Sequence, residues 1–207
     1  MYGGYFMNID QAALNPEFIA LFRKTFGFSQ EEFETLLVCF QHKRLRKKEF
    51  YIRSGRVCCA KAYINKGCAR TFVIDEHGHE RVLFFSFEDW WLADFESFYS
   101  GKPGVRYVQA IEDCDLLEIS KENFLRLESE IPKLKQWYPV KITRAIIASM
   151  KRMEEMKTLS AEERYLNLSK NRPDIFQRVP LQYIAAYLNI EPQSLSRMRK
   201  RLSAERR

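Results

Sequence analysis

The residues of this sequence that are best suited to a specific chemistry lie close to its C-terminus. Four polar side chains share the outer face of a short basic helix there: Gln193, Ser194, Arg197 and Arg199. Gln and Arg can form paired hydrogen bonds with base edges in DNA, and Ser can contact either bases or phosphates. Leu195 and Met198 stand three positions apart and face the opposite way, toward a core. The helix is therefore predicted to present a surface that reads DNA.

A second short helix precedes this one and is expected to hold it in place. Ile184, Ala185 and Leu188 give that helix an apolar face. Asn189 follows, and Asn tolerates the left-handed backbone conformation of a sharp helix end. Pro192 suits the first turn of the next helix, where a missing N–H has no partner to lose. Two helices joined in this way form a helix-turn-helix, whose second helix enters the major groove. The alternative is an ordinary pair of packed surface helices.

The distribution of charge supports a DNA-binding helix-turn-helix over an ordinary pair of surface helices. Residues 141–207 contain 15 Lys and Arg against 7 Asp and Glu, a net charge of +8, whereas residues 1–140 have a net charge of −1. All of the excess positive charge therefore lies in the C-terminal third. A basic segment attached to a neutral body is typical of a nucleic-acid-binding protein. A solubilising tail is the alternative, but these basic residues coincide with the helix-turn-helix.

Composition excludes several other classes of protein. Of the 207 residues, 46% are hydrophobic, which is enough for a packed core. No apolar run reaches about 18 residues, so we expect no transmembrane helix and no membrane partner. The segment MYGGYFMNID lacks a basic region and a long apolar stretch, so we expect no signal peptide and a cytoplasmic location.

The cysteines do not form a pattern typical of a disulfide framework or of a metal site. They are Cys39, Cys58, Cys59, Cys68 and Cys114. An odd number in a cytoplasmic chain argues against disulfides. None belongs to a C-x-x-C pair, so zinc or iron–sulfur ligation has little support, and we expect no metal and no cofactor.

The remaining sequence divides into helical and strand-rich regions. Residues 16–40 are expected to be helical, with a capping box at Ser29 and Glu32. Short runs rich in Val, Ile, Phe and Tyr follow between residues 43 and 119, separated by glycines, and they predict an antiparallel β-sandwich or barrel. Residues 75–79 are typical of a hairpin turn between two such strands. Residues 121–128 predict a short helix.

A longer helix is predicted from Pro132 to about Lys157. It carries apolar side chains on overlapping faces: Leu134, Trp137, Tyr138, Ile142, Ala145, Ile146, Met150 and Met153. This is more apolar surface than one sandwich can cover, and a parallel two-stranded coiled coil would bury the remainder. Packing within its own chain is the alternative. A second capping box at Ser160 and Glu163 begins a new helix, so residues 156–160 are the candidate hinge.

The order of these elements resembles the Crp/Fnr (catabolite-activator) family of bacterial transcription regulators. Two motifs carry the resemblance: the segment from Gly55 to Gly67, which is similar to a β-roll pattern of turn Gly, Tyr-x-Ile and x-Gly, and the helix-turn-helix. The resemblance covers residues 18–202. It implies an α+β fold with an N-terminal antiparallel β-roll of the cyclic-nucleotide-binding jelly-roll type. A long dimerisation helix and a C-terminal winged-helix/helix-turn-helix domain follow.

The resemblance also implies domains, partners and DNA contacts. Residues 1–131 would form the effector-sensing β-roll, 132–157 the dimerisation helix and hinge, and 158–207 the DNA-binding domain. A homodimer would bind double-stranded DNA at a pseudo-palindrome with half-sites about 34 Å apart, and RNA polymerase would be a further partner. Gln193, Ser194 and Arg197 fall where the family reads bases. The residues placed to touch phosphates are Tyr183, Arg199, Lys200 and Arg201. Only residues 171–179 are available for a wing, so it should be short or absent, with Arg172 and Arg178 contacting phosphates instead.

The cassette with which the family binds a cyclic nucleotide is altered here. That cassette reads Phe-x-Gly-Glu-x-x-Leu and is followed by Arg-Ser or Arg-Thr, whereas this sequence has Ala93 for the Gly and Asp94 for the Glu. Gly104 and Val105 stand where Arg-Ser is expected, and Arg106 comes two positions late. On a strand that shift moves a side chain by about 6–7 Å. We therefore expect no high-affinity cAMP binding.

Other effectors and other functions remain open at this stage. The residues that could line an effector pocket are Trp90, Trp91, Ala93, Asp94, Phe95, Arg106 and Tyr107, although the aromatic ones also suit the core. A sensing iron–sulfur cluster lacks N-terminal cysteines, and haem lacks support. His77 and His79 resemble part of a cupin metal site but no later His follows, so we do not expect an enzyme. The alternative function is a ligand-binding β-roll that acts as a protein-interaction module rather than on DNA.

Overall fold

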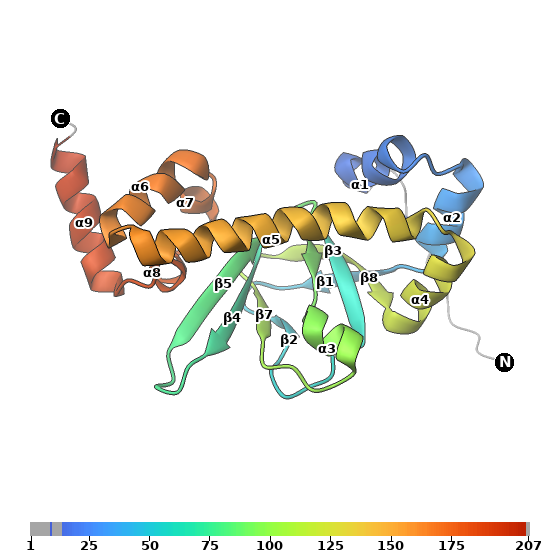
Figure 1. Cartoon of the computed structure of the whole chain (residues 1–207), viewed down its shortest axis with the longest axis horizontal. Coiled ribbons are helices and arrows are strands. Elements are labelled where there is room, and N and C mark those ends of the chain that lie inside the picture. The colour runs from blue at the N-terminus through green and yellow to red at the C-terminus, as the bar shows by residue number, and fades with distance from the viewer. Residues whose placement is uncertain (1–8, 10–13, 206–207) are drawn as a thin grey trace. The chain divides into compact units, whose positions relative to one another are not determined.

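The computed structural model describes residue 9 and residues 14–205, and Figure 1 labels its elements. The chain divides into two compact units. The first unit contains the described residues up to Thr71 together with residues 85–141, and the second contains residues 72–84 and the described residues from 142 onward. Residues 1–8 and 10, on which the expectation about a signal peptide rests, lie outside the described part of the chain.

Eight strands form the predicted β-roll. They are β1 (Gln41–Leu45), β2 (Phe50–Ile52), β3 (Ala60–Lys66), β4 (Ala69–Ile74), β5 (Glu80–Ser86), β6 (Trp91–Leu92), β7 (Tyr107–Ala110) and β8 (Cys114–Ser120). They build two four-stranded sheets with the strand orders β1-β8-β3-β6 and β2-β7-β4-β5. The pairs β1–β8, β3–β8, β3–β6 and β2–β7 are antiparallel. The predicted antiparallel jelly roll is confirmed.

The helices of the first unit cap this roll. They are α1 (Pro16–Ala20), the π-helical turn η2 (Leu21–Thr25), α2 (Gln30–Val38), α3 (Phe95–Ser100) and α4 (Lys121–Glu130). The predicted capping box begins α2, because the Ser29 side chain accepts a hydrogen bond from the Glu32 N–H and the Glu32 side chain accepts one from the Ser29 N–H. The left-handed backbone of Gly27 separates η2 from α2, so the region predicted as helical is two short helical pieces.

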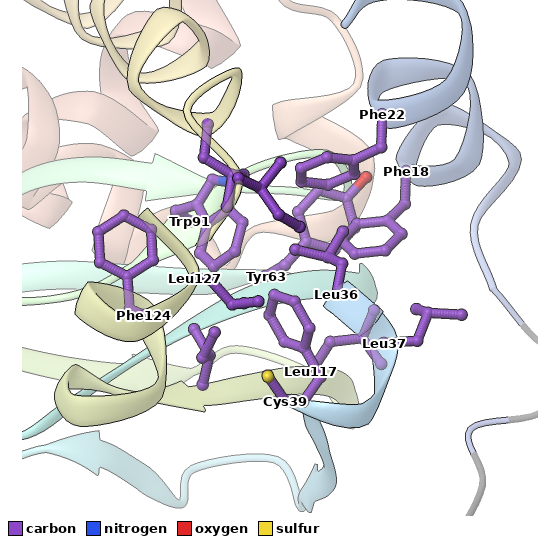
Figure 2. Packing of buried hydrophobic residues seen from close by; sticks show 14 of the residues in the cluster. Phe18, Phe22, Leu36, Leu37, Cys39, Tyr63, Trp91, Leu117, Phe124 and Leu127 are labelled. Carbon is purple, nitrogen blue, oxygen red and sulfur yellow. The ribbon is translucent and has the colours of Figure 1, made fainter. Parts of the chain in front are cut away.

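One aromatic cluster joins these helices to the roll (Figure 2). Tyr63 of β3 lies near its centre, with ring centroids 4.7 Å from Phe18 of α1 and 5.7 Å from Trp91 of β6. Phe124 and Leu127 add the inner face of α4, and Leu134 adds the first residue of the long helix. The cluster therefore packs α1, α4 and the start of α5 against β3 and β6 through apolar burial and tilted ring contacts.

The second unit is helical apart from the hairpin formed by β4 and β5. Its elements are the greater part of α5 (Leu134–Thr158), then α6 (Ala161–Asn171), α7 (Ile175–Arg178), α8 (Leu181–Leu188) and α9 (Pro192–Glu205). Helix α5 has 25 residues, close to the predicted length, and the capping box of Ser160 and Glu163 begins α6 as predicted. Among described residues 161–205 there is no strand, and α7 occupies the place where we expected a short wing or none.

A fully buried amine lies in the core of the first unit. Lys61 of β3 is 0% exposed, and its Nζ lies 2.9 Å from the centroid of the Phe124 ring. Trp91 and Phe98 also approach it, with centroids 5.4 and 5.5 Å away. Burial lowers the pKa of Lys61 from 10.5 to about 6. The folded protein therefore holds this lysine largely uncharged at neutral pH.

Replacing Lys61 with Met removes the amine at similar volume and should stabilise the protein at pH 7. Between pH 6 and 10.5 the unfolded chain binds a proton at Lys61 that the folded chain does not, so the free energy of unfolding of the wild type rises with pH there. The advantage of Lys61→Met should therefore shrink by up to about 1.4 kcal/mol per pH unit across this window. Urea denaturation from pH 6 to 9.5 measures it. Lys66→Met, an exposed change on the same strand, is the control, and a pH-independent advantage would contradict the assignment.

Candidate nucleic-acid interface and sensor site

The two helices of the predicted helix-turn-helix are α8 and α9. Helix α8 ends at Asn189, whose backbone is left-handed with φ 55° and ψ 49°, and the next residue, Ile190, donates its N–H to Ala185 O at 2.9 Å. Helix α9 begins at Pro192 as predicted, and Leu195 is fully buried against the unit. The local sequence rules for a sharp turn therefore produce the expected pair of helices.

The predicted base-reading residues lie together on α9. Gln193 and Arg197 are exposed and Ser194 is half-buried, with Arg197 Nη2 donating to Ser194 Oγ at 3.4 Å. Arg199 and Lys200 are also exposed one turn further on. The first two turns of α9 thus present a contiguous polar and basic surface, the arrangement that direct readout of bases requires.

Three of the residues predicted to touch phosphates have protein neighbours. Arg201 of α9 forms an ion pair with Glu162 of α6. Arg172 binds Asp174 through two nitrogens, at 2.7 Å for the closest pair, and this hydrogen bonding lowers the pKa of Asp174. Tyr183 of α8 is half-buried. Arg172 is therefore paired at the start of α7, and its expected contact with a phosphate stays a prediction.

Sequence reasoning did not identify Arg164, which braces the helix-turn-helix from α6. Its Nη1 donates to Leu159 O at 2.7 Å and its Nη2 donates to Leu188 O at 3.2 Å. The guanidinium thus ties the hinge before α6 to the last residue of α8, where carbonyl groups lack partners within the helix. An arginine on the inward face of an amphipathic helix was the available signal in the sequence.

In the first unit, the altered cassette forms a closed ion pair. Asp94 is 0% exposed and caps α3, where its Oδ1 accepts from the Ser97 N–H at 3.4 Å. The same oxygen accepts from Arg106 Nη1 at 2.6 Å, and Glu96 Oε2 lies 3.3 Å from that nitrogen. Arg106 therefore reaches the cassette despite its shifted position, but its charge is already matched by two carboxylates.

The loop before β7 packs directly onto this carboxylate. A methyl group at Gly104 would overlap Asp94 Oδ2, and it would lie 2.9 Å from Asp94 Cγ and 3.1 Å from Ser97 Cβ. Ser97 Oγ donates to Lys102 O at 2.5 Å and accepts from the Cys58 N–H at 2.9 Å. The backbone of this loop is thus packed directly against the cassette.

The other predicted pocket residues divide between core and surface contacts. Trp91 and Ala93 are buried members of the aromatic cluster, and Phe95 packs against it. Tyr107 lies with its ring centroid 6.1 Å from that of Phe50, and Trp90 is half-buried. Trp91 and Ala93 therefore lie in the core, and their expected role as pocket lining stays a prediction.

The histidine pair lies at the tip of the β4–β5 hairpin. His77 and His79 are exposed, and Asp75 Oδ1 accepts both of their backbone N–H groups, at 3.0 and 2.9 Å. These bonds, with Arg81, lower the pKa of Asp75 to about 2. Within the described part of the chain, no group of three His, Cys, Asp or Glu side chains is placed to hold a metal ion. The predicted hairpin turn is confirmed.

Helix α5 presents an exposed apolar stripe in the second unit. Ile146, Ile147, Met150 and Met153 are between 52% and 60% exposed. Ile146, Met150 and Met153 are separated by four and three residues, the spacing of one side of a coiled coil. The side chains of Trp137, Tyr138 and Ile142 lie outside the described set. None of the described helices combines the length and apolarity needed to cross a bilayer.

Replacing Gly104 with Ala should destabilise the first unit by about 1–3 kcal/mol, because the added methyl overlaps a buried carboxylate that cannot move aside freely. Urea denaturation followed by tryptophan fluorescence measures the change. The control is the same substitution in an Asp94→Ala background, where the overlapping group is gone and Gly104→Ala should cost markedly less. An equal cost in both backgrounds would show that the loop does not rest on Asp94.

Comparison with known proteins agrees with this geometry. Residues 42–130 match the model of the cyclic nucleotide-binding domain. No curated protein matches the chain. Among solved structures, the c-di-GMP-responsive regulator CLP of Xanthomonas campestris has a TM-score of 0.72 at 17% identity, covering 86% of this chain and 93% of that one.

Two further structures show the same arrangement. A Crp/Fnr family transcriptional regulator of Eubacterium rectale has a TM-score of 0.72 at 14% identity, covering 89% of this chain and 88% of that one. The catabolite activator protein of Thermus thermophilus has a TM-score of 0.55 at 20% identity, covering 89% and 87%. Residues 42–130 therefore resemble a cyclic nucleotide-binding domain, in a chain that has the fold seen in Crp/Fnr family transcriptional regulators.

Proposed function

We propose that the protein is a sequence-specific DNA-binding transcriptional regulator. The observation that carries this proposal is the exposed face of α9, where Gln193, Ser194 and Arg197 stand beside Arg199 and Lys200 in a unit with a strong positive charge. Such a face can read base edges while its outer cations bind phosphates. In a bacterial cell this role places the protein in the cytoplasm, with the chromosome and RNA polymerase.

The protein acts, in this proposal, as a homodimer on a pseudo-palindromic operator. Support comes from the stripe of Ile146, Met150 and Met153 on α5, which leaves apolar side chains more than half exposed at coiled-coil spacing. A second copy of the same helix would cover this stripe through an isologous interface. Two copies of α9 would then read two half-sites about one helical turn of DNA apart.

The β-roll serves as a sensor domain whose effector is not a cyclic mononucleotide. In this proposal Arg106 neutralises Asp94 and Glu96 instead of a ligand phosphate, and the Gly104 backbone fills the space beside them. A phosphate brought to this point would meet two carboxylates that already pair with Arg106. The described response of the related CLP to c-di-GMP is a precedent for a different effector on this fold.

Selection of DNA from a random pool, at near-physiological salt, tests the proposed function. Wild-type protein should recover a pseudo-palindrome, and the variant Arg197→Glu/Arg199→Glu should lose operator affinity by roughly a hundredfold or more, since each base contact contributes about 1–3 kcal/mol. Lys66→Glu/Lys102→Glu changes the net charge equally on exposed positions of the first unit and should retain the operator. Sedimentation should show a dimer in all three proteins.

Equal operator binding by both charge-reversal variants would disprove the recognition-helix assignment. Recovery of unrelated sequences whose binding disappears as salt rises would mean non-specific electrostatic binding only. A chain that binds no DNA but captures a protein through α9 would instead be an interaction module.

Calorimetric titration with cAMP and cGMP should give no saturable heat at micromolar ligand concentrations. The physical reason is that the arginine of the site is already paired with Asp94 and Glu96. The same preparation must bind its selected operator, which proves that the protein is folded and active. Micromolar binding that Arg106→Ala abolishes would show that Arg106 exchanges its carboxylates for the ligand phosphate, and the proposal for the sensor site would fail.

A further inference from the structure

Arg152 of α5 binds the main chain of two other segments in the second unit. Its Nη2 donates to Val82 O of β5 at 2.9 Å and to Tyr187 O of α8 at 2.8 Å, and its Nη1 donates to Leu83 O. The guanidinium also lies 3.9 Å from the centroid of the Tyr187 ring. One side chain thus joins a strand of the roll, the long helix and the first helix of the helix-turn-helix.

The acceptors of Arg152 are carbonyl groups that need a partner. β5 stands at the end of its sheet order among the described strands, so the carbonyls on its outer edge, which alternate with those that face β4, are not used by another strand of that sheet. Tyr187 lies in the last turn of α8, where carbonyls lack partners within the helix and attract a cation. A planar guanidinium with five donors can serve all three at once, whereas a lysine ammonium cannot span them.

A second contact joins the same hairpin to the turn of the helix-turn-helix. Arg81 of β5 donates from Nη1 to Asn189 Oδ1 at 2.5 Å, and its Nε binds Asp75 Oδ2 at 2.7 Å. Asp75 in turn holds the hairpin tip through the N–H groups of His77 and His79. The side chain of the residue that forms the sharp turn before α9 is therefore fixed by the hairpin.

We propose that Arg152 and Arg81 are positioning residues for the recognition helix, which lock the β4–β5 hairpin and the helix-turn-helix into one body. The inference rests on the proposed function, because it gives α9 its role in DNA binding. β4 begins at Ala69 in the first unit and continues into the hairpin without a break, so the main chain of one strand connects the first unit to the hairpin. In this proposal the hairpin and the helix-turn-helix move together as one rigid body.

Amide hydrogen exchange on the full-length dimer tests the lock without DNA. Arg152→Met should raise exchange at residues 80–84 and 187–190 by roughly tenfold or more, as expected for the loss of hydrogen bonds to a charged donor. Lys151→Met removes the same charge from the neighbouring exposed position and should leave both segments protected. Unchanged protection of β3 and β8 shows that the variant is folded, and Arg152→Lys provides a milder change. Equal exchange in the Arg152 and Lys151 variants would overturn the proposal.

The contact at the turn has its own test. Asn189→Gly removes the acceptor of Arg81, and Gly suits the left-handed backbone at this position. The variant should therefore raise amide exchange at residues 187–190 without adding backbone strain. Arg81→Met should raise exchange at the same amides, and at residues 187–190 the double variant should exchange no faster than either single variant, because both changes remove the Arg81–Asn189 contact. Additive effects would show that Arg81 and Asn189 act separately.

Operator spacing distinguishes positioning from a merely structural role. Wild type should prefer its selected half-site spacing over spacings one base pair longer or shorter, whereas Arg152→Met should lose roughly tenfold in affinity for the preferred spacing and discriminate less among the three. Retained discrimination, with exchange raised, would overturn the positioning role. If no operator is found at all, the proposed function fails, while the exchange experiment still decides whether the lock exists.

Discussion

Burial of one aromatic cluster is the constraint on which the first unit depends. The cluster takes side chains from α1, β3, β6, α4 and the first residue of α5, which are segments that no single sheet connects. Tyr63 and Trp91 lie where these segments meet, so β6 is held by its tryptophan as well as by two pairs with β3. The cassette that follows β6 inherits this fixed position. Lys61 lies among the same rings, and its low pKa is the consequence of packing a lysine into that cluster.

The sensor site follows from a second constraint, which is that a carboxylate without water needs a cation or several donors. Asp94 is fully buried, and the chain supplies Arg106, the Ser97 N–H and close packing of Gly104. Removing one partner of a buried ion pair leaves an uncompensated charge, which typically costs about 3–5 kcal/mol. A ligand that drew Arg106 away would therefore have to compensate Asp94 as well. The closed arrangement follows from the same Asp94 and Gly104 that distinguish the sequence from the family cassette.

The features that the sequence predicted correctly are those whose conformation depends on adjacent residues in the chain. The capping boxes at Ser29 and Ser160, the left-handed Asn189 and the start of α9 at Pro192 each depend on a few adjacent residues. The contacts that sequence did not predict join distant segments. A shift of two positions was expected to move the arginine by about 6–7 Å, yet the long side chain of Arg106 reaches Asp94 at 2.6 Å. The sequence allowed Trp91 a place in a pocket or in the core, and its burial in the aromatic cluster is a result of tertiary packing that no local pattern predicts.

Contacts between distant segments also explain why the β4–β5 hairpin belongs to the helical second unit, although its strands are part of the β-roll. Hydrogen bonds within a sheet fix β4 and β5 side by side, but the outward carbonyls of the end strand still require donors. Here a long helix supplies one arginine to Val82 O and Leu83 O of β5, and the same guanidinium binds the end of α8. A donor of this kind can leave one set of acceptors only if another replaces it, because unpaired buried groups are costly. The arginine therefore holds the hairpin and α8 together unless other donors take its place.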